Sequence, residues 1–106
     1  IKERFDEEIF GPILQVHFVG SFSEAIDEAN NTKFGLAASL ISDSRQLFDE
    51  FHSSINSGLV NFNATTTGAS GALPFGGVGK SGNYRPAGFY AADFCAWPKS
   101  SVLKKL

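Results

Sequence analysis

The stretch PFGGVGKSGN at residues 74–83 contains Gly-Lys-Ser, which ends the motif that P-loop proteins use to bind nucleotide phosphates. In the spacing G-x-x-x-x-G-K-[ST], the first glycine would stand at position 74, where this sequence has Pro74. Proline has no backbone N–H to offer a phosphate and cannot adopt a positive φ. Pro86 would also disrupt a helix that began at Lys80. We therefore predict that these glycines have a role other than phosphate binding.

Few other side chains could carry out chemistry. The sequence has one cysteine and two histidines, which argues against a dedicated zinc site of the usual Cys/His kind. We interpret Cys95 as a small packing residue, His17 as structural and His52 as solvated on the polar side of a helix. The acidic run at residues 6–8 is of a kind that ordinarily forms a solvated surface.

Length and composition restrict the class of protein. The 106 residues suffice for at most one domain, and 42% hydrophobic with 19% charged residues is typical of a globular chain. The net charge of −2 provides no basic field for nucleic acid or anionic lipid. No apolar run has the length of a membrane span. The single cysteine favours a reducing compartment, which we take to be the cytoplasm. The sequence starts at Ile1 and contains no methionine, so we expect a piece of a longer protein.

The first half of the chain has the pattern of an α/β fold. Residues 13–19 alternate in the manner of a strand. Ser21 and Glu24 have the spacing of a capping box, and an apolar stripe follows at helical spacing: Phe22, Ala25, Ile26 and Ala29. Residues 36–41, apolar or small throughout, predict a second strand that is covered on both faces.

A second helix and a third strand are predicted next. Asp43 and Gln46 repeat the cap spacing, Gly58 ends the helix, and residues 59–62 form the strand. The buried stripe of this helix is Leu47, Phe48, Phe51 and Ile55. The order β-α-β-α-β predicts a parallel sheet with right-handed crossovers. Because two helices cannot easily cover both faces of such a sheet, we expect it to pack against further protein.

The character of the sequence changes after Asn63. Residues 64–88 contain seven of the 11 glycines and two of the 4 prolines. A connection this long is rarely idle in a compact domain, so a functional loop is predicted. Residues 89–97 are predicted to form a helix or an extended segment, and residues 100–103 a terminal strand.

Three of these stretches carry a family resemblance. EEIFGPILQV at 7–16, VNFN at 60–63 and PFGGVGKSG at 74–82 resemble the C-terminal part of an aldehyde dehydrogenase, in that family's order. Many members continue the last motif as SGFGRE, whereas this chain has SGNYRP and then YAADFCAWP. Together with TGAS at 67–70, that continuation resembles the branch of the family that oxidises N-succinylglutamate 5-semialdehyde in arginine breakdown.

The resemblance implies an activity and a cofactor for the parent enzyme. A cysteine thiolate attacks the aldehyde, hydride passes to NAD, with NADP not excluded, and water activated by a glutamate releases the acid. It implies that Glu8 holds the nicotinamide ribose, while Glu7 stays a solvated residue, and that Phe10 contacts the nicotinamide end. Substrate-binding residues are implied in the loop: Gly68, Ala69 and Ser70 for a carboxylate, and Phe75 as a wall of the aldehyde pocket. Arg85 is either a surface charge or a residue that contacts an acidic substrate or braces the loop.

The resemblance also divides the chain. Residues 1–88 correspond to part of the catalytic domain, including the substrate loop, and residues 89–106 to a tail that forms a homo-oligomer. The segments that carry the family's nucleophile and general base do not occur in the sequence, nor does its nucleotide-binding domain, so the chain alone is expected to be inactive. An alternative is a non-catalytic module that only pairs with other subunits.

Overall fold

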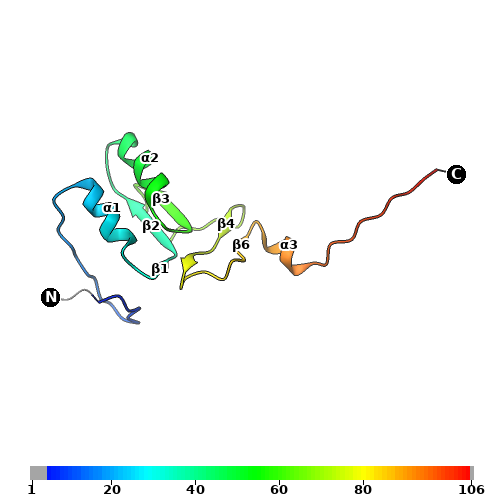
Figure 1. The fold of residues 1–106 in the computed structure, drawn as a ribbon, viewed down its shortest axis with the longest axis horizontal. Coiled ribbons are helices and arrows are strands. Elements are labelled where there is room, and N and C mark those ends of the chain that lie inside the picture. Colours follow the sequence, from blue (N-terminus) through cyan, green and yellow to red (C-terminus); the bar gives the residue numbers. More distant parts are fainter. Residues whose placement is uncertain (1–4, 106) are drawn as a thin grey trace.

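The computed structural model describes residues 5–105 and has the mixed α/β character that the sequence predicts (Figure 1). The described residues form three helices and six short strands, with two strands between α1 and α2 and four between α2 and α3. Their bounds are α1 Phe22–Asn30, β1 Phe34–Gly35, β2 Ala37–Leu40, α2 Arg45–Ser54, β3 Leu59–Phe62, β4 Pro74–Phe75, β5 Val78–Gly79, β6 Ala87–Gly88 and α3 Ala91–Cys95.

The β2 and β3 strands form a parallel pair in which Ala37 lies opposite Leu59 and Leu40 opposite Phe62. Parallel strands need a crossover connection, and α2 provides it. The second and third predicted strands, and the helix between them, are thereby confirmed. The other two ladders are antiparallel and only two residues long: β1 pairs with β5, and β4 with β6.

The prediction of a strand at residues 13–19 is wrong for this structure. These residues form no strand, and Phe18 is 96% exposed. A strand exists only as part of a ladder, and the ladder of β2 within the described residues is made with β3 alone. Instead, His17 Nδ1 lies 3.4 Å from Glu28 Oε1 on α1. Residues 100–103, predicted as a terminal strand, also lie outside any strand.

The start of α1 follows the predicted capping box. The Ser21 hydroxyl accepts a hydrogen bond from the Glu24 N–H at 3.2 Å. The Glu24 carboxylate accepts one from the N–H of Gly20 at 2.7 Å, one residue before the cap. These bonds satisfy backbone donors that the helix itself leaves free. The buried side chain of α1 is Ile26, a member of the predicted stripe.

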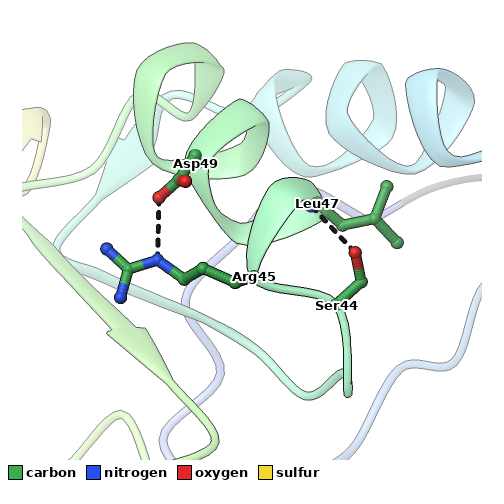
Figure 2. A network of polar contacts seen from close by, with 4 residues as sticks. All are labelled: Ser44, Arg45, Leu47 and Asp49. Atoms are coloured by element: carbon green, nitrogen blue, oxygen red, sulfur yellow. Dashed lines mark hydrogen bonds and ion pairs between the residues drawn. The ribbon is translucent and has the colours of Figure 1, made fainter.

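The start of α2 differs by one residue from the prediction. The cap is Ser44 rather than Asp43: Ser44 has an extended backbone, and its hydroxyl accepts from the Leu47 N–H at 3.3 Å (Figure 2). Both residue types cap helices well, so the backbone conformation decides between them. One turn along, Arg45 Nε donates to Asp49 Oδ1 at 2.9 Å.

The core of the described residues is small. Ile26 of α1 and Phe51 of α2 are its buried apolar side chains. The ring of Phe48 stacks on that of Phe62 at 4.6 Å and joins α2 to β3. The Asn30 amide connects the two helices, because it donates to the Ser54 carbonyl at 2.8 Å and accepts from the Asn56 N–H at 2.7 Å.

The overall shape is extended. The radius of gyration is 18.8 Å, whereas a compact domain of about 100 residues has about 13 Å. The tail after α3 runs away from the rest of the chain (Figure 1), and Trp97 on it is 91% exposed. Within residues 5–105, no helix has the length and apolar character needed to cross a membrane.

Candidate active-site segments

Glu8 and Phe10 lie on a loop, residues 5–15, that carries the EIFGP motif. Two tight turns shape it: the Gly11 N–H donates to the Ile9 carbonyl at 3.0 Å, and the Ile13 N–H to the Gly11 carbonyl at 2.8 Å. Glu8 is exposed and lines a hollow of about 690 Å³ beside α1, β1 and β2. Phe10 is 94% exposed. The motif therefore presents a carboxylate at a hollow and an aromatic ring at the surface.

The base of the 5–15 loop is tied to the rest of the chain. Asp6 Oδ1 accepts from the Thr32 hydroxyl at 2.6 Å, and its Oδ2 accepts from the Lys33 N–H at 3.1 Å. The Gln15 side chain donates to the Phe5 carbonyl at 3.2 Å and so closes the loop on itself. In the sequence, Asp6 stands out only as part of an acidic run at residues 6–8. Its partners are 26 and 27 residues away along the chain, so no local pattern could have found them.

The Gly-Lys-Ser stretch is used for internal pairing. β5 lies antiparallel to β1, the Lys80 N–H donates to the Lys33 carbonyl at 2.8 Å, and the Ser81 hydroxyl accepts from the Gly35 N–H at 3.2 Å. A phosphate cradle needs free N–H groups at the start of a helix, but Lys80 is followed by a turn. The structure thus agrees that the glycines here do not form a P-loop.

Phe75 lies on β4 and lines a second hollow of about 690 Å³. Lys80 and Arg85 line the same hollow, so two cationic side chains accompany the aromatic ring. Leu36 and Ser81 line both this hollow and the one at Glu8. The structure therefore brings the Glu8 and Phe75 hollows together at these two shared residues.

Gly68, Ala69 and Ser70 lie on an exposed loop and are not among the residues that line either hollow. The Ser70 hydroxyl accepts from the Ala72 N–H at 3.3 Å, and the Ser70 carbonyl from the Leu73 N–H at 3.1 Å. A hydroxyl has one donor and two acceptor positions, so Ser70 can accept this bond and still donate to a ligand.

Asn63 is a structural residue whose role the VNFN motif did not reveal. It takes a positive φ of 50°, which asparagine tolerates better than most residues. Its side chain accepts from the Ser42 N–H at 2.9 Å and donates to the Ser42 carbonyl at 2.8 Å. An asparagine directly after a strand was the signal in the sequence. It ends β3 and directs the chain into the loop that carries Gly68.

Comparison with known proteins matches residues 2–100 to the aldehyde dehydrogenase family. A curated relative from Sphingopyxis alaskensis, named N-succinylglutamate 5-semialdehyde dehydrogenase, is 58% identical over 102 residues, or 96% of this chain and 21% of that protein. The chain spans about one fifth of the length of the curated relatives that it matches.

Solved structures agree with the sequence match. An NAD-dependent aldehyde dehydrogenase from Sinorhizobium meliloti superposes with a TM-score of 0.75 at 37% identity, over 82% of this chain and 17% of that one. Aldehyde dehydrogenase 21 from Physcomitrella patens, solved with its reaction product succinate, gives a TM-score of 0.66 at 28% identity, over 71% of this chain and 16% of that one. Since the family match covers nearly the whole sequence, the chain belongs to the aldehyde dehydrogenase family.

Proposed function

We propose that this chain is the C-terminal portion of an NAD-dependent dehydrogenase that oxidises N-succinylglutamate 5-semialdehyde to N-succinylglutamate in arginine breakdown. The observation that carries this choice of substrate is the 58% identity to a relative with that name over 96% of the chain. The hollow at Phe75 supports it, because Lys80 and Arg85 line the hollow and a dicarboxylic semialdehyde is anionic.

Glu8 and Phe10 are the residues proposed to hold the cofactor. An exposed carboxylate at the rim of a hollow can accept hydrogen bonds from the two adjacent hydroxyls of a ribose, and an exposed aromatic ring offers a flat apolar contact to the nicotinamide. The residues present thus fit the group. NAD, when bound, supplies the hydride acceptor of the reaction, and NADP would supply the same chemistry.

The substrate is proposed to enter past the exposed loop at Gly68, Ala69 and Ser70. Backbone N–H groups and the Ser70 hydroxyl are suitable donors to the substrate's carboxylate. Phe75 would form an apolar wall beside the aldehyde end, and Arg85 would attract the acidic end. These groups bind and orient the substrate rather than react with it.

The remaining chemistry is proposed to come from elsewhere in the parent protein. The sequence contains neither the segment of the family's nucleophilic cysteine nor that of its general-base glutamate. Cys95, which the sequence predicts to be a small packing residue, is exposed in the structure instead. We therefore propose that residues 1–88 complete a catalytic domain, that the nucleotide-binding domain lies outside this chain, and that the chain alone is inactive. A cytoplasmic location fits these proposals.

The tail at 89–106 is proposed to mediate homo-oligomer formation. Trp97, Val102 and Leu103 are each more than nine-tenths exposed, and apolar residues of this size are rarely left in water together. The same observation favours the alternative, a chain that only pairs with other subunits. In either case the occupant of this surface would be another copy or another part of the parent protein.

The test is an assay of the complete protein that contains this chain. We expect NADH formation with N-succinylglutamate 5-semialdehyde, at a kcat/KM well above that for an uncharged aldehyde such as propanal. Glu8→Gln should raise the KM for NAD, with Glu7→Gln as the matched control. A complete protein without turnover would contradict the proposal and favour the pairing module. An unchanged KM for NAD in Glu8→Gln would contradict the cofactor role.

A further inference from the structure

We infer that Asp6 and Thr32 are positioning residues for Glu8, because they hold the base of the 5–15 loop against the turn between α1 and β1. This inference rests on the proposed function, since it concerns how the carboxylate proposed to bind NAD is kept in place. Asp6 stands two residues before Glu8 and is half-buried, whereas Glu8 is exposed. The two acidic residues therefore face different surroundings although they are near neighbours in sequence.

The contacts of Asp6 are of a strong kind. One carboxylate oxygen accepts a hydrogen bond from the Thr32 hydroxyl at 2.6 Å, and the other accepts one from the Lys33 N–H at 3.1 Å. Bonds to an ionised acceptor are shorter and stronger than neutral ones. The Thr32 oxygen also accepts from the Phe34 N–H at 3.2 Å, which fixes the direction in which the hydroxyl donates. The Thr32 hydroxyl and the Lys33 N–H are thus held in place at the start of β1.

The hydrogen bonds of Asp6 and of Gln15 leave Glu8 and Phe10 on a short exposed stretch between these two residues. Asp6 fixes one end, and the bond from Gln15 to the Phe5 carbonyl fixes the other. Ordering a loose loop on binding costs conformational entropy. A loop whose base is already fixed loses less conformational entropy when NAD binds. Removal of the Asp6 contacts should therefore weaken NAD binding, although Asp6 is not proposed to touch the cofactor itself.

The same turn also holds the second proposed site. The Lys33 N–H donates to Asp6, and the Lys33 carbonyl accepts from the Lys80 N–H at 2.8 Å. Lys80 lines the hollow of Phe75. The 5–15 loop and the 74–82 segment are therefore both hydrogen-bonded to the backbone of Lys33, the first to its N–H and the second to its carbonyl. This shared residue sets the position of Glu8 relative to the hollow of Phe75.

The test measures the Kd for NAD by titration calorimetry on the complete protein. Asp6→Ala and Thr32→Val should each raise the Kd by about three- to tenfold, which is the loss of one or two hydrogen bonds. Thr32→Ser keeps the hydroxyl and should stay near the wild type. Asp49→Ala removes a carboxylate that pairs with Arg45 on α2 (Figure 2) and is the matched control, with an unchanged Kd. The KM for the aldehyde at saturating NAD should not change.

A double-mutant cycle separates positioning from general stability. If Asp6 acts through Glu8, Asp6→Ala should raise the Kd by less than about twofold once Glu8→Gln is present. Equal factors in both backgrounds would overturn the inference, as would a wild-type Kd for both Asp6→Ala and Thr32→Val when Glu8→Gln alone weakens binding. A wild-type Kd for Glu8→Gln itself would instead refute the cofactor role and, with it, the reason for the inference. Should Asp6→Ala fail to fold, Thr32→Val in the two backgrounds gives the same cycle.

Discussion

Residues 64–73 and 74–82 follow one another and are both rich in glycine, yet their glycines have different surroundings. A Cβ added at Gly68 or Gly71 would meet nothing within 4 Å. A Cβ at Gly82 would collide with the carbonyl of Gly77, and one at Gly58 with the carbonyl of Gly76. The 74–82 segment therefore packs backbone against backbone, whereas the 64–73 segment stands open to solvent.

Under the proposed function, this difference separates a segment that supports the site from a segment that contacts the substrate. The 74–82 segment is fixed through β5 and through the bonds of Lys80 and Ser81 to the start of β1. Glycines are needed in this segment because its backbone lies close to neighbouring backbone segments of the same chain. Gly79 also has a positive φ of 57°, which glycine adopts readily. The 64–73 segment lacks such packing at Gly68 and Gly71, which is compatible with its proposed contact with substrate, since functional loops commonly project from a rigid scaffold.

The largest effect is expected from Gly82→Ala in the complete protein. The new methyl group would meet main-chain atoms, which cannot move aside as a flexible side chain can. We expect a loss of about 1–3 kcal/mol in the free energy of unfolding, typical of overpacking. The matched change Gly68→Ala should stay within about 0.5 kcal/mol. Thermal unfolding of both variants measures these losses of stability. Similar melting temperatures for Gly82→Ala and Gly68→Ala would contradict the distinction between the two segments.

An effect of up to the same size is expected at the junction where the open segment begins. Asn63→Ala removes both hydrogen bonds to Ser42 and keeps a side chain at positive φ. We expect a loss of about 1–3 kcal/mol. Asn63→Gly removes the same bonds but relieves the backbone, so it should cost less. Chemical denaturation would compare the two, and a glycine variant less stable than the alanine variant would contradict this account of the junction.

The features that sequence reasoning captured are local ones. The Ser21 cap and the burial of Ile26 on α1 and of Phe51 on α2 follow from residue spacings inside each helix. The β2–β3 pair follows from the order of the elements along the chain. The strand predicted at 13–19 failed because apolar alternation shows which side chains favour burial, but a ladder also needs a neighbouring strand. The sequence alone also treats Gly68 and Gly82 alike, since what they touch depends on the fold.

For the candidate site too, the sequence indicated individual residues but not how they are arranged in space. The motifs pointed to Glu8, Phe10 and Phe75 one by one, and the shared lining residues Leu36 and Ser81 became visible only in three dimensions. The bond between Asp6 and Thr32 spans 26 positions. Contacts of that separation depend on how α1 and β1 are placed, which local patterns do not specify.

The most direct test of the account compares two serines, one in each segment, in the complete protein. Ser70→Ala should lower kcat/KM for N-succinylglutamate 5-semialdehyde relative to propanal by about fivefold, the value of one hydrogen bond. It should cost less than about 0.5 kcal/mol of stability, because the bond that it loses from the Ala72 N–H is exposed to solvent. Ser81→Ala loses the bond from the Gly35 N–H, so it should cost about 0.5–1.5 kcal/mol of stability and leave that ratio unchanged. The reverse outcome, with selectivity lost at Ser81 and stability lost at Ser70, would contradict the division into a supporting and a substrate-facing segment.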